Sequence, residues 1–449
     1  MKKILFAHIL HGNTTGKITS SHGLFYDYLF NSYDFATARK YLEANQKAIK
    51  SIETIINMEN IDCDFERQDN YIYTQNADFL AKLKAEVTTV NKLGFNAELV
   101  EKAPIPIEIL GAVKFPNQAQ FHPRKYAIGL AKAISSRSSQ IYENSKVVDV
   151  KKEDNFYLTY TSKNTVKSKY VIIASHFPII NFPGFYFSKM YQSTSYIVAL
   201  DTHTSLFDGM YINAETPTFS FRTVPFNSSR LLLVAGSDHK TGSKIDLTAS
   251  YSVLIDKAKS MYPNADVKYM WYAEDCISLD KIPYVGEFSE FMPNVFVATG
   301  FKKWGITGTN VAAHIICDKI LEHENEYADV FRSTRLKPIK NYQEFGNVLK
   351  QTVNSLVVEK FKVPKETLSS IANEEGKVIE TDGQKIGVYR DDEGKLYGIK
   401  PICSHLGCEL SWNNLNHTWD CPCHGSVFSY EGKSLYEPSI KDLDVIDLE

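Results

Sequence analysis

The 449-residue chain lacks several features that would place it in a specialised class of protein. It has no apolar run of the roughly 18 residues that a membrane-spanning helix needs, so we expect no membrane span. Seven cysteines are too few for a disulfide-built scaffold of this length. A net charge of −3 gives no reason to expect a nucleic-acid partner. The 43% hydrophobic content instead predicts a globular protein with sizeable cores.

The opening stretch MKKILFAHIL carries only part of the pattern of an export signal. Two lysines precede apolar residues, but His8 and His11 interrupt the run and no small-residue cleavage site follows. We therefore interpret this stretch as a β-strand. Without an export signal the predicted location is the reducing cytoplasm, where clustered cysteines indicate a metal site first.

Helix and strand patterns alternate through residues 1–330, which we interpret as the body of the protein. Residues 33–62 have the apolar spacing of a long amphipathic helix. Its broad apolar face holds Tyr41, Ile49, Ile52, Ile55 and Ile56. Alternating or buried strands are predicted within residues 147–174, at 230–236 and at 294–300, and a helical stretch follows the last. This mixture predicts an α/β or α+β body.

The pattern changes toward the C-terminus. Residues 331–362 contain a proline and few strand signals, so we interpret them as a linker. Residues 363–449 show short strands and Asp-Gly or Glu-Gly turns, which predict a small all-β module. From Phe361 onward the chain has 9 basic and 16 acidic residues, against 41 and 37 in the rest. This acidic module could dock on the mildly basic body, or the charges could simply form a solvated face.

The module contains CSHLGCELSWNNLNHTWDCPCHG, in which four cysteines and three histidines stand within 23 residues. The spacing is Cys403-x-His405, then Cys421-x-x-His424, so each of two loops offers one thiolate and one imidazole. A tetrahedral zinc ion is one candidate metal for such a set of ligands. Zinc fingers, however, place two cysteines in one half and two histidines in the other. The mixed arrangement favours an iron–sulfur cluster with two chemically distinct irons.

The pair CSHLGC and CPCHGS closely resembles the Rieske [2Fe-2S] domain, over roughly residues 363–449. The resemblance implies that Cys403 and Cys421 hold one iron and that His405 and His424 hold the other. It further implies a disulfide between Cys408 and Cys423, for which two free buried thiols are the alternative, and a hydrogen bond from the Ser426 hydroxyl to a cluster sulfide.

Three stretches of the body resemble FAD-dependent oxidoreductases of the glycine-oxidase and D-amino-acid-oxidase type that are fused to a C-terminal Rieske domain. They are HGNTTGKITSSHGLFYDYL, AQFHPRKYAIGLAKAI and DKIPYVGEFSEFMPNVFVATGFKKWGITGTNVAAHII. The last reads as a strand, a glycine-bearing loop and a helix N-terminus, whose positive end would stabilise negative charge on a reduced flavin. The cofactor-binding residues that the resemblance implies are Thr14, Thr15, Lys17, Val147, Gly300, Gly305, Ile306 and Thr307.

Three polar residues are candidates for catalysis or substrate binding. Arg222 and His239 stand beside predicted strands, and Lys303 lies in the glycine-bearing loop. Packing or solvent-exposed roles are the alternatives.

The N-terminal sequence of this chain differs from that of the FAD-dependent oxidoreductases it resembles. Family members open with a strand, a Gly-x-Gly-x-x-Gly turn and a helix that hold the FAD pyrophosphate. This chain has no such fingerprint, so by comparison its first βα unit is missing. Either the true start lies upstream or the FAD site is impaired, because no helix N-terminus would receive the pyrophosphate.

Two functions follow from these patterns. The first is an enzyme, an oxidoreductase that passes electrons from a small, amine- or amino-acid-like substrate through FAD to a [2Fe-2S] cluster and an external acceptor. The alternative is a non-catalytic Rieske electron carrier or redox-responsive protein with a degenerate flavin domain. A Rieske oxygenase is disfavoured, because the body shows no closely spaced histidine pair with a neighbouring carboxylate.

Overall fold

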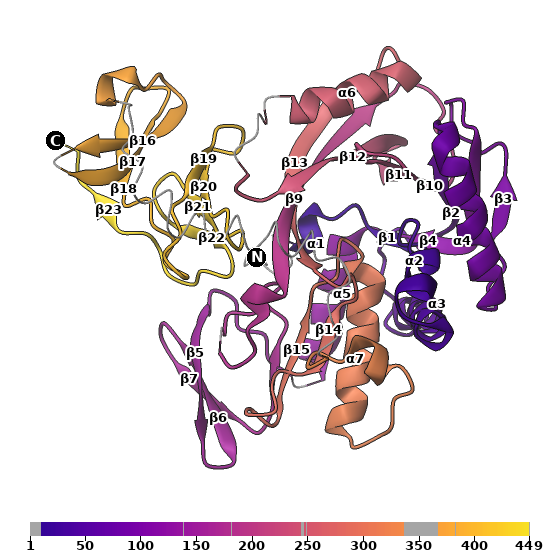
Figure 1. Ribbon diagram of the computed structural model, residues 1–449, viewed down its shortest axis with the longest axis horizontal. Coiled ribbons are helices and arrows are strands. Elements are labelled where there is room, and N and C mark those ends of the chain that lie inside the picture. The colour runs from indigo at the N-terminus through magenta and orange to yellow at the C-terminus, as the bar shows by residue number, and fades with distance from the viewer. Residues whose placement is uncertain are drawn as a thin grey trace.

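The computed structural model describes residues 10–137, 139–180, 182–243, 247, 249–335, 367–381 and 383–448. Two predictions therefore fall largely outside the described residues, namely the strand over residues 1–10 and the linker over residues 331–362. Leu10, the one described residue of that predicted strand, begins a helix instead. The remainder forms a mixed body and a small C-terminal module (Figure 1).

A nine-stranded sheet is the largest element of the body (Figure 1). Its order is β1-β4-β2-β10-β11-β12-β9-β13, with β3 paired to β4, and only β2 and β10 run parallel. The strands are β1 (Lys17–Ile18), β2 (Glu66–Thr74), β3 (Glu98–Val100), β4 (Gly111–Gln120), β9 (Met190–Asp201), β10 (Met210–Asn213), β11 (Phe219–Phe226), β12 (Ser229–Lys240) and β13 (Asp266–Ser278). Most residues of β9 are buried, and Tyr196, Val198 and Leu200, which alternate along the strand, pack against helix α6 (Ser250–Met261) on one face of the sheet.

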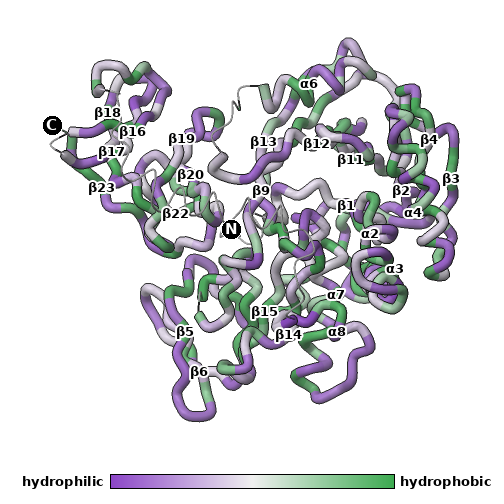
Figure 2. The backbone as a smooth tube through the Cα atoms, in the orientation of Figure 1, coloured by the Kyte–Doolittle hydropathy of each residue, from purple (hydrophilic) through white to green (hydrophobic). Residues whose placement is uncertain are grey.

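Two smaller sheets complete the strands of the body. Strands β14 (Tyr284–Glu287), β15 (Val295–Thr299) and β8 (Val171–Ile173) form one, in which β15 and β8 are parallel. Strands β5 (Val147–Glu153), β6 (Phe156–Thr161) and β7 (Thr165–Ser168) form the other. Figure 2 shows hydrophobic residues at the enclosed β15 and hydrophilic ones along the outer β5–β6 hairpin, in agreement with their burial.

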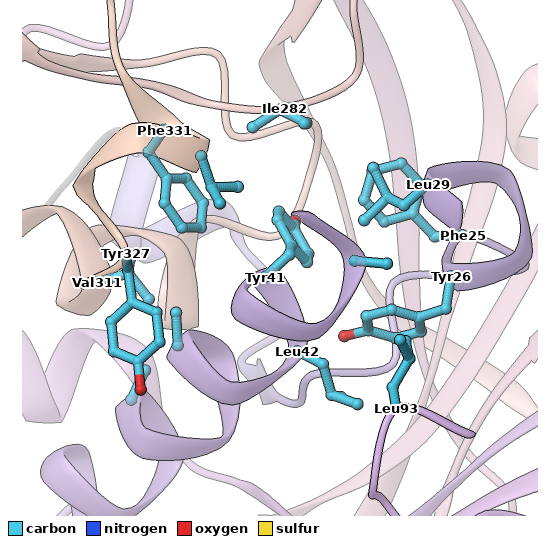
Figure 3. Packing of buried hydrophobic residues seen from close by; sticks show 14 of the residues in the cluster. Phe25, Tyr26, Leu29, Tyr41, Leu42, Leu93, Ile282, Val311, Tyr327 and Phe331 are labelled. Atoms are coloured by element: carbon cyan, nitrogen blue, oxygen red, sulfur yellow. The ribbon is translucent and has the colours of Figure 1, made fainter. Parts of the chain in front are cut away.

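The helices pack around these sheets. Besides α6, the described helices are α1 (Leu10–Asn13), α2 (Tyr26–Ser32), α3 (Phe35–Met58), α4 (Leu80–Lys92), α5 (Pro123–Ser136), α7 (Gly305–Ile320) and α8 (Ala328–Phe331). Short 3-10 helices lie at Ala77–Phe79, Tyr186–Ser188 and Leu368–Ser370. The predicted amphipathic helix is α3, and the Asp34 side chain caps it by accepting a hydrogen bond from the Thr37 backbone N–H at 2.7 Å. Tyr41 on its buried face stacks on Phe331 with ring centres 5.4 Å apart (Figure 3).

Glu86 provides the cap that α2 lacks at its own N-terminus. Its carboxylate accepts hydrogen bonds from the backbone N–H groups of Phe25 (3.0 Å), Tyr26 (2.9 Å) and Asp27 (2.9 Å), and the side chain is fully buried. Glu86→Ala would leave three donors without a partner, so we expect the free energy of unfolding to fall by about 3 kcal/mol. Urea unfolding followed by circular dichroism measures this loss. Glu43→Ala, which removes an exposed partner of Arg39, is the control, and an equal loss there would contradict the capping role.

The C-terminal module is all-β, as the sequence predicts. One sheet has the order β16-β17-β18-β23 and the other β19-β20-β21-β22. The strands are β16 (Glu375–Thr381), β17 (Gln384–Arg390), β18 (Leu396–Ile399), β19 (Ser411–Asn413), β20 (Thr418–Asp420), β21 (Val427–Ser429), β22 (Ser434–Tyr436) and β23 (Val445–Ile446). Trp419 and Phe428 are fully buried in its core, against four cysteines. In the described part of the chain, no helix is both long enough and apolar enough to cross a membrane.

Candidate functional site

Two loops of the C-terminal module have the same backbone geometry. The first begins at Cys403 after β18, and the second begins at Cys421 after β20. In each, the glycine four residues on donates its N–H to the cysteine carbonyl at 2.9 Å, and the cysteine N–H reaches the carbonyl five residues on at 2.8 Å. Gly407 and Gly425 have φ of +79° and +80°, a conformation that favours glycine. The loops therefore present their cysteine and histidine side chains in matching ways.

The four predicted metal ligands come together between these loops. Cys403, Cys421 and His424 are buried, His405 is half-buried, and the two imidazole rings stand 5.1 Å apart and perpendicular. Burial lowers the pKa of His405 to about 4 and that of His424 to about 3, so both rings are neutral at ordinary pH. The hydrogen bond between the two thiols lowers the pKa of Cys403 and raises that of Cys421. Neutral imidazoles and thiolates are the forms that bind metals.

The predicted disulfide is present. Cys408 and Cys423 are bonded across the two loops, with Cα atoms 6.6 Å apart, and both are buried. The alternative of two free thiols is therefore wrong. The sulfur atoms of Cys408, Cys421 and Cys423 lie within 4.8 Å of one another, but only Cys421 among them retains a thiol.

A third loop supports this site. The buried Ser426 hydroxyl accepts a hydrogen bond from the Ser439 backbone N–H at 3.0 Å and forms a second with the Cys403 sulfur. Ser439 in turn contacts Ser404 in the first loop at 2.5 Å. Ser426 therefore sits where a hydroxyl can donate to a sulfur atom of the site. The hydrogen bond to an inorganic sulfide stays a prediction.

A cavity of about 730 Å³ lies in the body between the large sheet and the start of α7. Of the predicted cofactor and catalytic residues, Thr14, Thr15, Lys17, Lys303, Gly305 and Ile306 line it. Its wall is apolar along α7 and β8, at Ile172, Ala174, Ala312 and Ile316, and polar beneath the large sheet.

Lys17 stands in the polar part of the wall. Its ammonium group donates to the Tyr211 carbonyl and the Ser220 hydroxyl, both at 2.7 Å. Burial and the nearby Arg222 lower the pKa of Lys17 to about 7. Lys17 is therefore a cation in this cavity only below about neutral pH. Lys303, at the other side of the wall, pairs with Asp238 at 3.2 Å.

The other predicted body residues lie behind or away from the described cavity wall. Arg222 is buried and donates to the carbonyls of Gly16 (2.9 Å) and Phe121 (3.2 Å), so its contacts hold the loop that carries Lys17. His239 stacks on Tyr196 at 5.8 Å. Thr307 donates to the Thr19 carbonyl at 3.2 Å, behind the wall.

Two more predicted cofactor residues also have other neighbours. Gly300 has a φ of +74°, a conformation that favours glycine, and a Cβ there would come within 3.2 Å of Met190 and Ser278, so backbone conformation and packing account for this glycine. Val147 pairs with Thr161 in the outer β5–β6 hairpin. Contact of either residue with a flavin stays a prediction.

The cluster-binding loops pack directly on the strands that form the cavity. A Cβ on Gly425 would lie 2.4 Å from Gln192 of β9, and one on Gly242 would lie 2.5 Å from the Pro422 nitrogen. The Gln192 amide donates to the Glu437 carbonyl at 2.5 Å. The residues on either side of Gln192 along β9 line the cavity. One residue of one strand therefore separates the cavity from the loops of the C-terminal module.

Sequence reasoning missed two residues near this junction. Phe187 of the body lies edge-on to both histidines, with ring centres 6.4 Å from His405 and 5.7 Å from His424. Glu274 of β13 is a fully buried carboxyl group in the cavity wall. The sequence could have indicated Glu274 through the adjacent acidic pair in the weakly charged stretch WYAEDCIS. No nearby sequence feature indicated Phe187.

Comparison with known proteins identifies both parts of the chain. A family model described as "FAD dependent oxidoreductase" matches residues 10–319, and one described as "Rieske [2Fe-2S] domain" matches residues 362–447. The chain belongs to the FAD-dependent oxidoreductase family. It carries a Rieske domain at its C-terminus. A Bacillus subtilis relative, "Putative Rieske 2Fe-2S iron-sulfur protein YhfW", is 36% identical over 437 residues, which cover 97% of this chain and 86% of the relative.

Solved structures of low sequence identity share the fold of the body. Glycine oxidase from Geobacillus kaustophilus superposes with a TM-score of 0.60 at 19% identity, covering 73% of this chain and 91% of that one. L-proline dehydrogenase from P. horikoshii superposes with a TM-score of 0.56 at 14% identity, covering 65% and 83%. The FAD-dependent oxidoreductase fold and the Rieske fold together imply FAD and a [2Fe-2S] cluster as cofactors, and hence redox activity.

The residues present fit both groups. At the Rieske site both imidazoles are neutral, and the buried Nδ1 of His424 has no hydrogen-bond partner among the described residues, which leaves a lone pair for a metal. In the body, a cavity of about 730 Å³ falls in the range of cofactor sites, and the N-terminus of α7 opens into it at Gly305.

Proposed function

We propose that this protein oxidises a small amine- or amino-acid-like substrate in the body cavity and passes the electrons through FAD to the Rieske cluster and an external acceptor. A bound FAD takes two electrons from a substrate, and a [2Fe-2S] cluster accepts and passes one electron at a time. The packing of Gly425 on Gln192, next to the cavity wall, carries this proposal. It supports electron passage within one molecule.

At the Rieske site we assign Cys403 and Cys421 to one iron and His405 and His424 to the other. Three observations support this: the matched backbone of the two loops, the perpendicular imidazoles, and the disulfide that ties the loops together. The disulfide limits how far the loops can separate, so the four ligand atoms stay together.

In the cavity, the chain itself supplies binding and orientation. Lys17 offers a positive charge to an anionic group of the substrate below about neutral pH. Arg222 fixes the loop on which Lys17 stands through the Gly16 carbonyl. The apolar wall along α7 and β8 excludes water from a bound ring.

The experiment is an anaerobic titration of the FAD-supplied full-length protein with dithionite, with absorbance reporting the flavin and electron paramagnetic resonance reporting the cluster. We expect one flavin and one cluster per chain, and the cluster to be reduced before or together with the flavin, because a cluster that accepts electrons from FAD has the higher reduction potential. A panel of amines and amino acids then identifies those that reduce both.

The alternative function is a Rieske electron carrier without a working flavin site. The favouring observation is that three of the predicted flavin-binding residues, Val147, Gly300 and Thr307, do not line the cavity. A reducible cluster in a protein that retains no FAD would establish this alternative and contradict the enzyme proposal. Zinc in place of iron and sulfide would contradict both.

A further inference from the structure

Glu274 lies at the boundary between the cavity and the Rieske loops. It stands on β13 in the cavity wall and is only 2% exposed. The hydroxyls of Thr194 on β9 and Thr241 after β12 contact its two carboxyl oxygens. Thr241 precedes Gly242, which packs on the Rieske backbone at Pro422. The carboxyl group therefore has the cavity on one side and the cluster loops on the other.

These three side chains close a ring of hydrogen bonds. Thr194 Oγ1 lies 2.9 Å from Glu274 Oε1, Thr241 Oγ1 lies 2.6 Å from Oε2, and the two hydroxyl oxygens lie 2.9 Å from each other. Three O–H···O contacts need three protons, but two hydroxyl groups supply only two. A proton on the carboxyl group supplies the third. All three side chains are fully buried, so the geometry is that of a neutral carboxylic acid.

The surroundings favour the same state. Burial, together with the nearby carboxyl groups of Asp420 on β20 and Asp275 on β13, raises the pKa of Glu274 to about 8, although the hydrogen bonds from Thr241 and Thr194 act to lower it. The other titratable groups that face Glu274 are the phenols of Tyr196, Tyr272 and Tyr436 and the thiol of Cys276, whose pKa burial raises well above its ordinary value. Phenols carry no charge near neutral pH, so no cation among these neighbours draws the proton away.

We propose that Glu274 rests as a neutral acid and relays protons out of the cavity through Thr241, in step with the electrons that leave for the cluster. Oxidation of a substrate that loses two hydrogen atoms releases two electrons and two protons. For each proton, an O–H bond forms on one Glu274 oxygen while the O–H bond on the other oxygen breaks, and the Thr241 hydroxyl passes the released proton to solvent water on the Rieske side, which is the final acceptor. After each proton has passed, the Glu274 carboxyl group is neutral again. This role rests on the proposed function.

The first test is the infrared spectrum of the full-length holoprotein at pH 7, oxidised and then reduced with dithionite. Wild type is compared with Glu274→Gln, an amide that keeps hydrogen-bonding capacity but cannot exchange a proton with the cavity. We expect a neutral-carboxyl C=O band that changes on reduction in wild type and is absent from the variant. Identical spectra would overturn the proposal. Because dithionite reaches the cluster without the substrate, this result is independent of the proposed function.

The second test is the rate of cluster reduction from the cavity in H2O and D2O. For Glu274→Gln and Thr241→Val we expect rates lower by about 100-fold and a smaller solvent isotope effect. Thr241→Ser, which keeps the hydroxyl, should retain the wild-type rate and isotope effect. A merely structural role would slow the reaction and leave the isotope effect unchanged, and that outcome would overturn the proposal. Absence of any cluster reduction in wild type would contradict the proposed function instead.

The stability of the fold gives a third readout that needs no substrate. A carboxyl whose folded pKa of about 8 exceeds its ordinary value of 4.5 binds its proton more tightly in the folded state between those values. Stability from Glu274 is therefore fully present below pH 4.5 and is lost as pH rises toward 8. We expect the melting temperature of wild type to fall relative to that of Glu274→Gln over this window. A constant difference would contradict a neutral Glu274.

Discussion

Cys421→Ser is expected to abolish the [2Fe-2S] cluster while the body keeps its fold. Cys421 is fully buried between the two loops and is one of only two thiols that remain at the site once Cys408 and Cys423 are bonded. A serine hydroxyl stays protonated at neutral pH and cannot replace a thiolate ligand to iron. Loss of a hydrogen-bonding neighbour of a metal ligand already lowers affinity by about 10- to 100-fold, so loss of the ligand should lower it further.

Iron and acid-labile sulfide per chain, together with the paramagnetic resonance signal of the reduced protein, measure this loss. Cys63→Ser is the matched control, because Cys63 is a buried free cysteine of the body, and we expect wild-type iron and sulfide there. Circular dichroism should report an unchanged fold for both variants. A Cys421→Ser protein that retains a full complement of iron and sulfide would refute the assignment of the ligands.

Gly242→Ala is expected to uncouple the cavity from the cluster without removing either. Gly242 has a φ of +74°, and an added Cβ would meet the Pro422 nitrogen at 2.5 Å and the Cys421 carbonyl carbon at 2.7 Å. Backbone atoms cannot swing aside as a side chain can, so the loop must move away from the body. Electron transfer weakens exponentially with the separation of donor and acceptor, by several-fold for each ångström. We expect the rate of cluster reduction from the cavity to fall several-fold or more.

The matched control for this variant is Gly394→Ala. Gly394 also has a positive φ, +86°, but nothing lies within 4 Å of its Cβ position. It therefore carries the same backbone strain without the clash, and we expect a wild-type transfer rate. Iron content and the cluster signal must remain unchanged in Gly242→Ala for the comparison to hold. Equal rates in the two variants would mean that the contact at Gly242 does not govern transfer.

The elements whose residues are close in sequence were predictable. Cys403 and His405, and likewise Cys421 and His424, lie within single loops, so their spacing indicated a candidate ligand set, to which the resemblance to Rieske domains added the pairing on two irons. The helix α3 followed from the spacing of its buried face, and the disulfide from the resemblance that the two cysteine motifs carry. Both signals are local, because a helical face or a ligand pair is complete within a few residues.

The cavity wall was less predictable, because distant strands assemble it. Lys17 is held by Tyr211 and Ser220, about 200 residues away, and Glu274 is held by Thr194 and Thr241. These neighbours depend on the order β12-β9-β13, which no sequence period encodes.

Arg222 and Gly425 illustrate the same limit. The sequence marked Arg222 as polar beside a strand, but the strand order turns its guanidinium toward Gly16 and Phe121. Gly425 is a glycine partly because Gln192 of the body occupies the place of its Cβ, a constraint that comes from another domain.

The central claim is that electrons pass from the cavity to the cluster within one molecule. Its most direct test is the rate of cluster reduction after a light pulse reduces the flavin of the anaerobic, FAD-loaded protein. If the Rieske loops receive electrons across the packed contact at Gln192, the rate is first-order and does not change when the protein is diluted tenfold. A rate that falls in proportion to dilution would show that electrons pass between molecules, and it would contradict the account.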